Sequence, residues 1–248
     1  MHSYENKIVC FLDILGFKNI VNETQYDDTK LQQVQDALKF LENYKYETDS
    51  HNTNINNKDK VITQFSDSLI ISFSIDLEGE FVSSVWEILY IIVSLIKHGF
   101  LVRGGITYGK IVHTGNLVFG PAFIEAYELE LSASTPRVVL SFNLLNQISS
   151  KEISNPQKYL LAQDCDGYFY IDYFKTMNAH DNNYEYFIYF NTLHSIIIHG
   201  LSYDKANIRV KYEWMRIKYN EVVYLIKNND LSHLEYETRM HIAQLSQI

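Results

Sequence analysis

Residues 7–15 (KIVCFLDIL) constrain the fold more than any other part of the sequence. The run is apolar at nearly every position, contains a single acidic residue, Asp13, and is followed at once by Gly16. Such a run predicts a short strand that is buried on both faces inside a sheet. Because an unpaired carboxylate is costly to bury, Asp13 must have a partner, bind a metal or point outward at the strand end.

The segments that follow predict an α+β domain. Helical spacing and strand-like runs alternate along the chain, and Ser66 with Asp67 predicts a tight turn inside one hairpin. The expected helices are 32–46, 81–97 and 121–131, and the expected strands lie in 61–73, 100–112, 117–119 and 137–141. This order predicts a ferredoxin-like, palm-type antiparallel sheet with helices on one face. The polar stretch 47–60 predicts an exposed loop, and the glycines in 100–112 predict close backbone approach.

We expect residues 1–150 to form one domain and residues 151–248 to form an extension packed on it. The extension contains an aromatic strand-like run at 168–174 and helical segments at 184–199 and 208–227. No repeat and no Pro/Gly-rich linker separates the two parts. We interpret the aromatic residues of the extension, including Trp214, as core or dimer interface.

The charge balance excludes several classes of partner. The chain has 248 residues, 30 acidic and 21 basic side chains and a formal charge of −9. Broad binding to nucleic acid or to a membrane surface is therefore not expected. Cys10 and Cys165 cannot form a disulfide framework or a four-thiolate zinc site, and Cys10 is expected to be a buried thiol. The polar N-terminus does not resemble a signal peptide, and we expect a cytoplasmic protein.

Asp13 and Asp67 form the candidate chemical site. If the hairpin pairs beside the first strand, both carboxylates reach one edge of the sheet. Two such groups repel each other unless a cation lies between them, and Mg²⁺ or Mn²⁺ prefers oxygen ligands of this kind. Gly16 opens the next turn, so that backbone amides can face a phosphate. The alternative is that Asp13 caps a helix and Asp67 is only a turn residue.

Four motifs resemble those of class III nucleotidyl (adenylate/guanylate) cyclase catalytic domains. Residues 11–17 (FLDILGF) match the FxDIxGF signature, and residues 65–68 (FSDS) resemble the hairpin with the second metal aspartate. Residues 103–109 (RGGITYG) resemble the R-x-G-I-x-x-G strand, and residues 118–122 (VFGPA) resemble the start of the last active-site helix. The motifs follow the order of the family across residues 7–142.

The resemblance implies a two-metal mechanism that converts a nucleoside triphosphate to a 3′,5′-cyclic mononucleotide and pyrophosphate. Asp13, Asp67 and the carbonyl of Ile14 would hold two Mg²⁺ or Mn²⁺ ions. The amides of Leu15, Gly16 and Phe17 would bind the terminal phosphates. Members of the family work as head-to-tail dimers, which implies a homodimer.

The sequence also departs from the family. Ile124 and Glu128 stand where the family has a catalytic Asn and Arg, so the positive charge must come from elsewhere; Arg103 is our candidate, with Lys211, Lys18 and Lys110 as others. Thr63 and Leu117 stand at the two purine-reading positions. A base smaller than a purine is therefore expected. In this respect the chain resembles the pyrimidine cyclases of the Pycsar anti-phage systems.

Other interpretations of the function remain open. Residues 166–167, 170–174, 211–214 and 219–220 are similar to a tail found in uncharacterised bacterial relatives, and this set includes Lys211. The loss of the Asn and Arg favours a degenerate nucleotide-binding sensor with the cyclase fold. A palm-type enzyme that makes cyclic dinucleotides or short oligomers is a further alternative, whereas the acidic composition disfavours a nuclease. Glu125, Glu128 and Glu130 predict a solvated helix face, and His113 predicts a local hydrogen bond rather than a zinc ligand.

Overall fold

The computed structural model describes residues 3–50, 60–74, 80–115, 117–148, 160–176, 183–228, 240 and 243–248. The chain divides into two compact units, Met1–Ile171 and Asp172–Ile248. None of the described helices combines the length and the apolar character that a membrane span needs. Both cysteines are free thiols, and Cys10 is buried as expected.

Strand β1 (Glu5–Ile14) lies inside the sheet of the first unit. Every residue from Lys7 to Leu12 is buried, and β1 pairs antiparallel with β3 (Ser68–Ser74) on one side and β4 (Val102–Thr114) on the other. The prediction of a strand buried on both faces is confirmed. The hairpin is also confirmed, since β2 (Val61–Phe65) pairs with β3 across the turn at Ser66 and Asp67.

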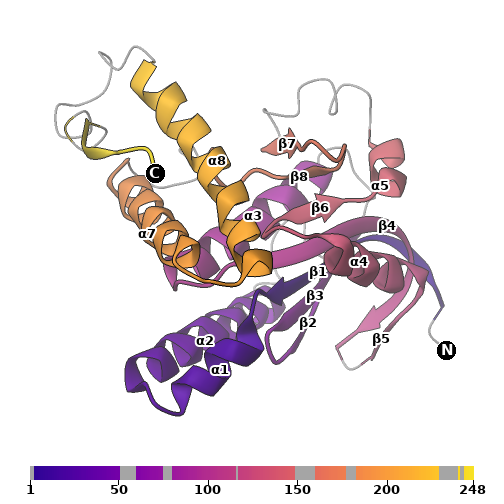
Figure 1. The fold of residues 1–248 in the computed structure, drawn as a ribbon. Coiled ribbons are helices and arrows are strands. Elements are labelled where there is room, and N and C mark those ends of the chain that lie inside the picture. Colours follow the sequence, from indigo (N-terminus) through magenta and orange to yellow (C-terminus); the bar gives the residue numbers. More distant parts are fainter. Residues whose placement is uncertain are drawn as a thin grey trace. The chain divides into compact units, whose positions relative to one another are not determined.

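The complete sheet has the order β2-β3-β1-β4-β6-β8-β7 (Figure 1). Its first four strands have the order and antiparallel pairing of a ferredoxin-like core, so the predicted α+β, palm-type class is confirmed. Strand β6 (Val138–Leu140) adds parallel to β4, and β5 (Leu117–Phe119) pairs with the far end of β4. Strands β7 (Leu161–Gln163) and β8 (Phe169–Ile171) continue the sheet beyond residue 150.

A buried arginine fastens the β7–β8 hairpin to β6. Arg137 is 4% exposed, and its guanidinium forms ion pairs with Asp164, at 2.7 Å, and with Asp166. Two carboxylates compensate the buried charge, because a lone guanidinium would be costly there. The hairpin is therefore an integral part of the first unit.

Helices cover both faces of β1, so the expectation of helices on one face of the sheet is wrong. The helices in the described part of this unit are α1 (Phe17–Thr24), α2 (Asp28–Ser50), α3 (Glu80–Lys97), α4 (Pro121–Ser132) and α5 (Phe142–Gln147). Helix α4 packs Ala122 and Ala126 against Val9 and Phe11 on one face. The opposite face of β1 is equally buried, and α3 contacts β3 and β4. Helix α2 continues to Ser50, into the stretch expected to be a loop, and residues 51–59 lie outside the described part.

Gly105 lets α4 approach β4 closely. This confirms the close backbone approach predicted from the glycines in 100–112. A Cβ atom built on Gly105 would lie 2.3 Å from the Ala126 carbonyl oxygen and 2.5 Å from the Leu129 Cβ. We therefore expect Gly105→Ala to lower the free energy of unfolding by about 1–3 kcal/mol, because α4 must shift. Urea denaturation measures this loss. Gly115→Ala is the control, since nothing lies within 4 Å of a Cβ there; an equal loss in both variants would contradict the close-packing account.

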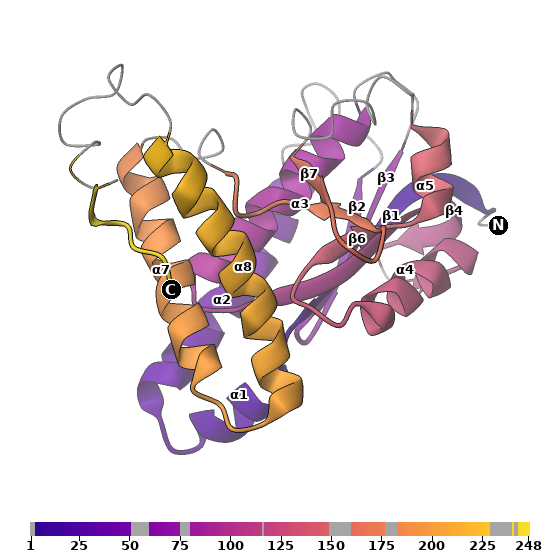
Figure 2. The same ribbon diagram turned by 45° about the horizontal axis from the view of Figure 1, so that its top comes forward.

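The second unit is built around the side-by-side helices α7 (Asn183–Leu201) and α8 (Ala206–Asn228) (Figures 1 and 2). Its core is aromatic: the rings of Phe190 and Tyr219 stack with centroids 4.4 Å apart, and the Tyr189 hydroxyl donates to the Tyr173 carbonyl at 2.7 Å. These contacts agree with a core role for its aromatic residues. The strand expected over 168–174 is confined to Phe169–Ile171.

Candidate functional site

The pairing of β1 brings Asp13 and Asp67 to the same end of the sheet. Asp13 pairs with Ser68 of β3 on one side and with Arg103 of β4 on the other. Asp67 directly precedes Ser68 in the hairpin turn, and its carbonyl accepts a hydrogen bond from the Ile14 amide at 3.3 Å. The two aspartates thus meet because the hairpin lies beside β1.

The carboxylates of Asp13 and Asp67 interact unfavourably. Burial raises the pKa of Asp13, and the negative charge of Asp67 raises it further. The Ser68 hydroxyl donates to Asp13 Oδ1 at 3.2 Å, and Arg103 Nη2 lies 3.9 Å from Asp13 Oδ2; both oppose this shift in pKa. They do not cancel it, so a further positive charge would be favourable here.

Arg103 is held mainly by a glutamate of α4. Its Nη2 lies 2.5 Å from Glu130 Oε1, and the Glu130 side chain is only 3% exposed. The expectation that Glu130 faces solvent is therefore wrong. Glu130 follows the buried Ala126 by four residues, which places both on one face of the helix. Glu125 also points inward enough for its Oε2 to accept a hydrogen bond from Thr107 at 2.8 Å.

The turn after β1 offers fewer amides than expected. The Leu15 amide donates to the Leu101 carbonyl at 2.8 Å, so it is already engaged within the protein. The phosphate role expected of Leu15 conflicts with this bond. Gly16 adopts a left-handed conformation, with φ 77°, and α1 begins at Phe17. The amides of the first helical turn lack acceptors within their helix, so those of Gly16 and Phe17 remain suited to an anion.

Thr63 belongs to a hydrogen-bonded chain that the sequence did not reveal. Its Oγ1 lies 3.0 Å from His113 Nε2, and His113 Nδ1 lies 2.9 Å from Ser72 Oγ. Burial, with the positive charges of Lys7 and Lys45, lowers the pKa of His113 to about 4, so the imidazole is neutral at pH 7. The local hydrogen bonding expected of His113 is present. Leu117, at the start of β5, is 44% exposed.

The remaining candidates lie on α4 and α8. Ile124 and Glu128 face outward on α4, and Ile124 is 56% exposed. Lys211 lies on α8 in the second unit.

Asp13 and Asp67 have the chemistry of a divalent-cation site. Within the described ranges, no group of three or more His, Cys, Asp and Glu side chains is arranged to hold a metal ion. The pair instead offers two hard carboxylates, with the Ile14 carbonyl as a backbone oxygen nearby. Mg²⁺ is commonly held by one or two carboxylates and otherwise by water and substrate phosphates. Burial, and then repulsion from Asp67, raises the pKa of Asp13, and a bound cation would offset both effects, so these residues fit such an ion.

No family model matches the chain, and no curated protein matches it. Among solved structures, the adenylyl cyclase CyaB from P. aeruginosa is 14% identical, with a TM-score of 0.48 over 68% of this chain and 94% of that one. The catalytic core of a rhodopsin-guanylyl cyclase in complex with ATPalphaS is 14% identical, with a TM-score of 0.46 over 68% and 95%. Adenylate cyclases from Trypanosoma brucei in their monomeric state are 12% identical, with a TM-score of 0.43 over 60% of this chain and 77% of that one.

Proposed function

We propose that this chain is a nucleotide cyclase that converts a nucleoside triphosphate to a 3′,5′-cyclic mononucleotide and pyrophosphate in the cytoplasm. The observation that carries the proposal is the meeting of Asp13 and Asp67 at one end of the sheet, beside the start of α1. The ordered motifs across residues 7–142 support it. No single motif would be sufficient.

In this proposal Asp13, Asp67 and the Ile14 carbonyl hold two Mg²⁺ or Mn²⁺ ions. When bound, such ions neutralise the triphosphate and lower the pKa of the ribose 3′-hydroxyl. The amides of Gly16 and Phe17 bind the terminal phosphates and fix their orientation. The 3′-oxygen forms a bond to the α-phosphorus, the bond from that phosphorus to the bridging oxygen breaks, pyrophosphate leaves, and the hydroxyl proton passes to water.

Arg103 is the proposed source of positive charge beside the α-phosphate. It lies next to Asp13, and Glu130 restricts its guanidinium to that end of the sheet. A cation fixed before the substrate arrives stabilises developing charge without further reorganisation. Arg103 would then take over part of the role that Ile124 and Glu128 cannot perform.

We infer a pyrimidine base from the two positions that would read it. Thr63 carries a single hydroxyl, which is already bonded to a neutral His113, and Leu117 offers no polar group. Neither side chain supplies the several hydrogen bonds that distinguish one purine from another. A pyrimidine cyclic nucleotide acting in anti-phage signalling, through a separately encoded receptor, is the setting that we propose.

Incubation with each of the four nucleoside triphosphates and Mn²⁺, followed by mass spectrometry, tests the activity. We expect a cyclic mononucleotide and pyrophosphate in equal amounts, and faster turnover of CTP or UTP than of ATP or GTP. No product from any of the four at concentrations that favour dimers would overturn the proposal. A linear or dimeric product would instead favour the palm-type synthase.

A nucleotide-binding sensor is the second candidate, because Ile124 and Glu128 face outward on α4 with no catalytic chemistry. A ligand that binds only the folded protein raises its melting temperature. Stabilisation by a triphosphate with Mn²⁺, without any turnover, would distinguish this function from the cyclase.

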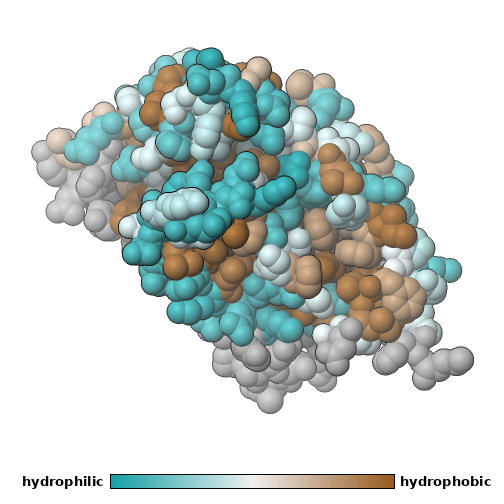
Figure 3. All heavy atoms as spheres, turned by 60° about the horizontal axis from the view of Figure 1, so that its bottom comes forward, coloured by the Kyte–Doolittle hydropathy of each residue, from teal (hydrophilic) through white to brown (hydrophobic). Residues whose placement is uncertain are grey.

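We also propose a homodimer, formed in part by the outer face of α4. Ile124, Tyr127 and Leu131 lie on this face at helical spacing and are 56%, 43% and 56% exposed. One side of the molecule shows hydrophobic residues between hydrophilic ones (Figure 3). Sedimentation over a range of concentrations should show a dimer that Ile124→Asp weakens at least about tenfold. Tyr26→Asp is the control, because Tyr26 is 91% exposed and lies between α1 and α2, so this change should leave the dimer unchanged. A chain that stays monomeric at high concentration contradicts this assembly.

A further inference from the structure

A surface cavity between α2 and α3 is lined by four aromatic side chains. Its volume is about 330 Å³, and the rings are those of Phe40, Tyr44, Tyr90 and His98. Neither Asp13 nor Asp67 lines it. The cavity is thus separate from the site proposed for cyclisation, and it belongs entirely to the first unit.

The rings form one continuous aromatic surface that is open to solvent. The Phe40 centroid lies 6.0 Å from that of Tyr90 and 6.2 Å from that of His98, and Tyr44 lies 6.0 Å from Tyr90. Tyr90 is nevertheless 56% exposed. Aromatic faces that gain no cover from the protein itself are available for stacking with a flat ligand.

Tyr44 is fixed in place before any ligand arrives. Its hydroxyl donates to Glu87 Oε2 at 2.9 Å, and Lys60 Nζ forms an ion pair with the same oxygen at 2.7 Å. Lys60 Nζ also lies 5.1 Å from the centre of the Tyr44 ring. These contacts immobilise the wall of the cavity, so less conformational entropy is lost on binding than at a flexible surface.

The polar residues at the cavity decide the class of ligand. Lys39 lines it, and Lys60 already lies over the Tyr44 ring, so a further cation is disfavoured. Asp36, whose Oδ1 accepts from Gln32 at 2.8 Å, and Asn43 supply acceptors and a donor for the polar edge of an uncharged ring. Flat aromatic rings with a polar edge of this kind are characteristic of nucleobases.

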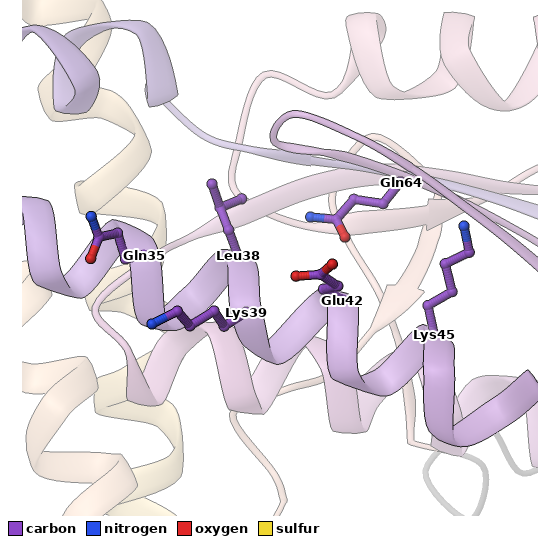
Figure 4. Close-up of a pocket in the computed structure, with 6 residues that line it drawn as sticks. All are labelled: Gln35, Leu38, Lys39, Glu42, Lys45 and Gln64. Atoms are coloured by element: carbon purple, nitrogen blue, oxygen red, sulfur yellow. The ribbon is translucent and has the colours of Figure 1, made fainter. Parts of the chain in front are cut away.

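We propose that this cavity binds a nucleoside, with its base stacked on Tyr90 and its polar edge toward Asp36 and Asn43. The Phe40 ring is inclined by 55° to that of Tyr90, so it contacts the base at an angle and does not stack on it. Stacking of a base on an aromatic side chain contributes about 1–3 kcal/mol and tolerates different bases. A neighbouring cavity of about 440 Å³ lies on the side of α2 that faces Gln64 of β2 and has no aromatic lining (Figure 4). Lys39 lines both cavities, which places a positive charge beside the bound nucleoside.

Titration of the full chain with adenosine and with cytidine in EDTA tests the proposal. Nucleosides without phosphate, in the absence of divalent metal, do not report on the Asp13 site. We expect saturable binding in equilibrium dialysis and saturation-transfer NMR. Tyr90→Ala should weaken it about 5- to 150-fold, the range that corresponds to the loss of one stacked ring. Trp86→Ala is the matched control, because Trp86 is another exposed aromatic of α3 and does not line the cavity.

Three further variants make the outcome decisive. Tyr90→Phe should retain binding and Tyr90→Leu should lose it, which separates the flat ring from bulk alone. Asp13→Asn should bind both nucleosides as the unaltered chain does, whatever its effect on cyclisation. The proposal is overturned if neither nucleoside binds saturably up to millimolar concentration, or if Tyr90→Leu binds as tightly as Tyr90→Phe.

Discussion

Asp13→Asn is expected to abolish cyclic-nucleotide formation while leaving the protein folded. The substitution keeps the shape of the side chain but removes one of the two carboxylates that would hold the cations. Metal ions contribute several kcal/mol of transition-state stabilisation, and each 1.4 kcal/mol is tenfold in rate. We therefore expect turnover to fall about 1,000-fold or more, and Asp67→Asn to behave alike. Mass spectrometry of the product gives the rate.

The stability of Asp13→Asn should depend on pH differently from that of the unaltered protein. The folded state raises the pKa of Asp13, so folding is opposed once the unfolded chain ionises this group, above about pH 4. In the absence of metal, Asp13→Asn removes this opposition and should gain stability over the unaltered protein as the pH rises from 4 to 7. Added Mn²⁺ should stabilise only the unaltered protein. Asp204→Asn, on an exposed loop, is the control. Full activity in Asp13→Asn or in Asp67→Asn would show that the site is elsewhere.

Glu130→Gln is expected to produce the largest loss of stability among the charge substitutions. The change leaves the Arg103 guanidinium, with a side chain 21% exposed, without the carboxylate that lies 2.5 Å away. Removing one partner of a buried ion pair costs more than the pair itself contributes. Arg103 would keep only the more distant Asp13 carboxylate, at 3.9 Å, so its charge would be poorly compensated. We expect the free energy of unfolding to fall by about 3 kcal/mol, measured by urea denaturation.

Two comparisons test the explanation. Glu128→Gln lies on the exposed side of the same helix, so its effect should stay within about 0.5 kcal/mol. The double variant Arg103→Met/Glu130→Met should recover much of the loss, since two apolar side chains can replace a buried pair. If Glu130→Gln is as stable as Glu128→Gln, then Glu130 does not hold Arg103.

The parts of the fold that could be predicted from the sequence are those with a strong local pattern. Residues 7–15 are apolar at nearly every position, and the turn at Ser66 and Asp67 separates two runs of strand residues. Once these strands pair, the meeting of Asp13 with Asp67 follows from the register alone. The roles of the two carboxylates are still predictions.

The contacts that could not be predicted depend on partners distant in the chain. From the sequence alone Glu130 resembles a solvated residue, because no residue near it in the chain indicates its ion pair with Arg103. The link from Thr63 through His113 to Ser72 joins three strands, and no spacing within one strand predicts it. The Leu15 amide is engaged by Leu101 because β1 and β4 continue side by side past Asp13.

The position of β7 and β8 limits how this chain can be shortened. Both strands lie beyond residue 150, and β8 pairs with β6, in which each residue is at most 2% exposed. A fragment cut at residue 150 would lay open the hydrogen-bonding edge of β6 and remove the carboxylates that neutralise Arg137. Uncovered strand edges recruit other chains into aggregates. Any recombinant piece intended to carry Asp13 and Asp67 alone should therefore extend to Ile171.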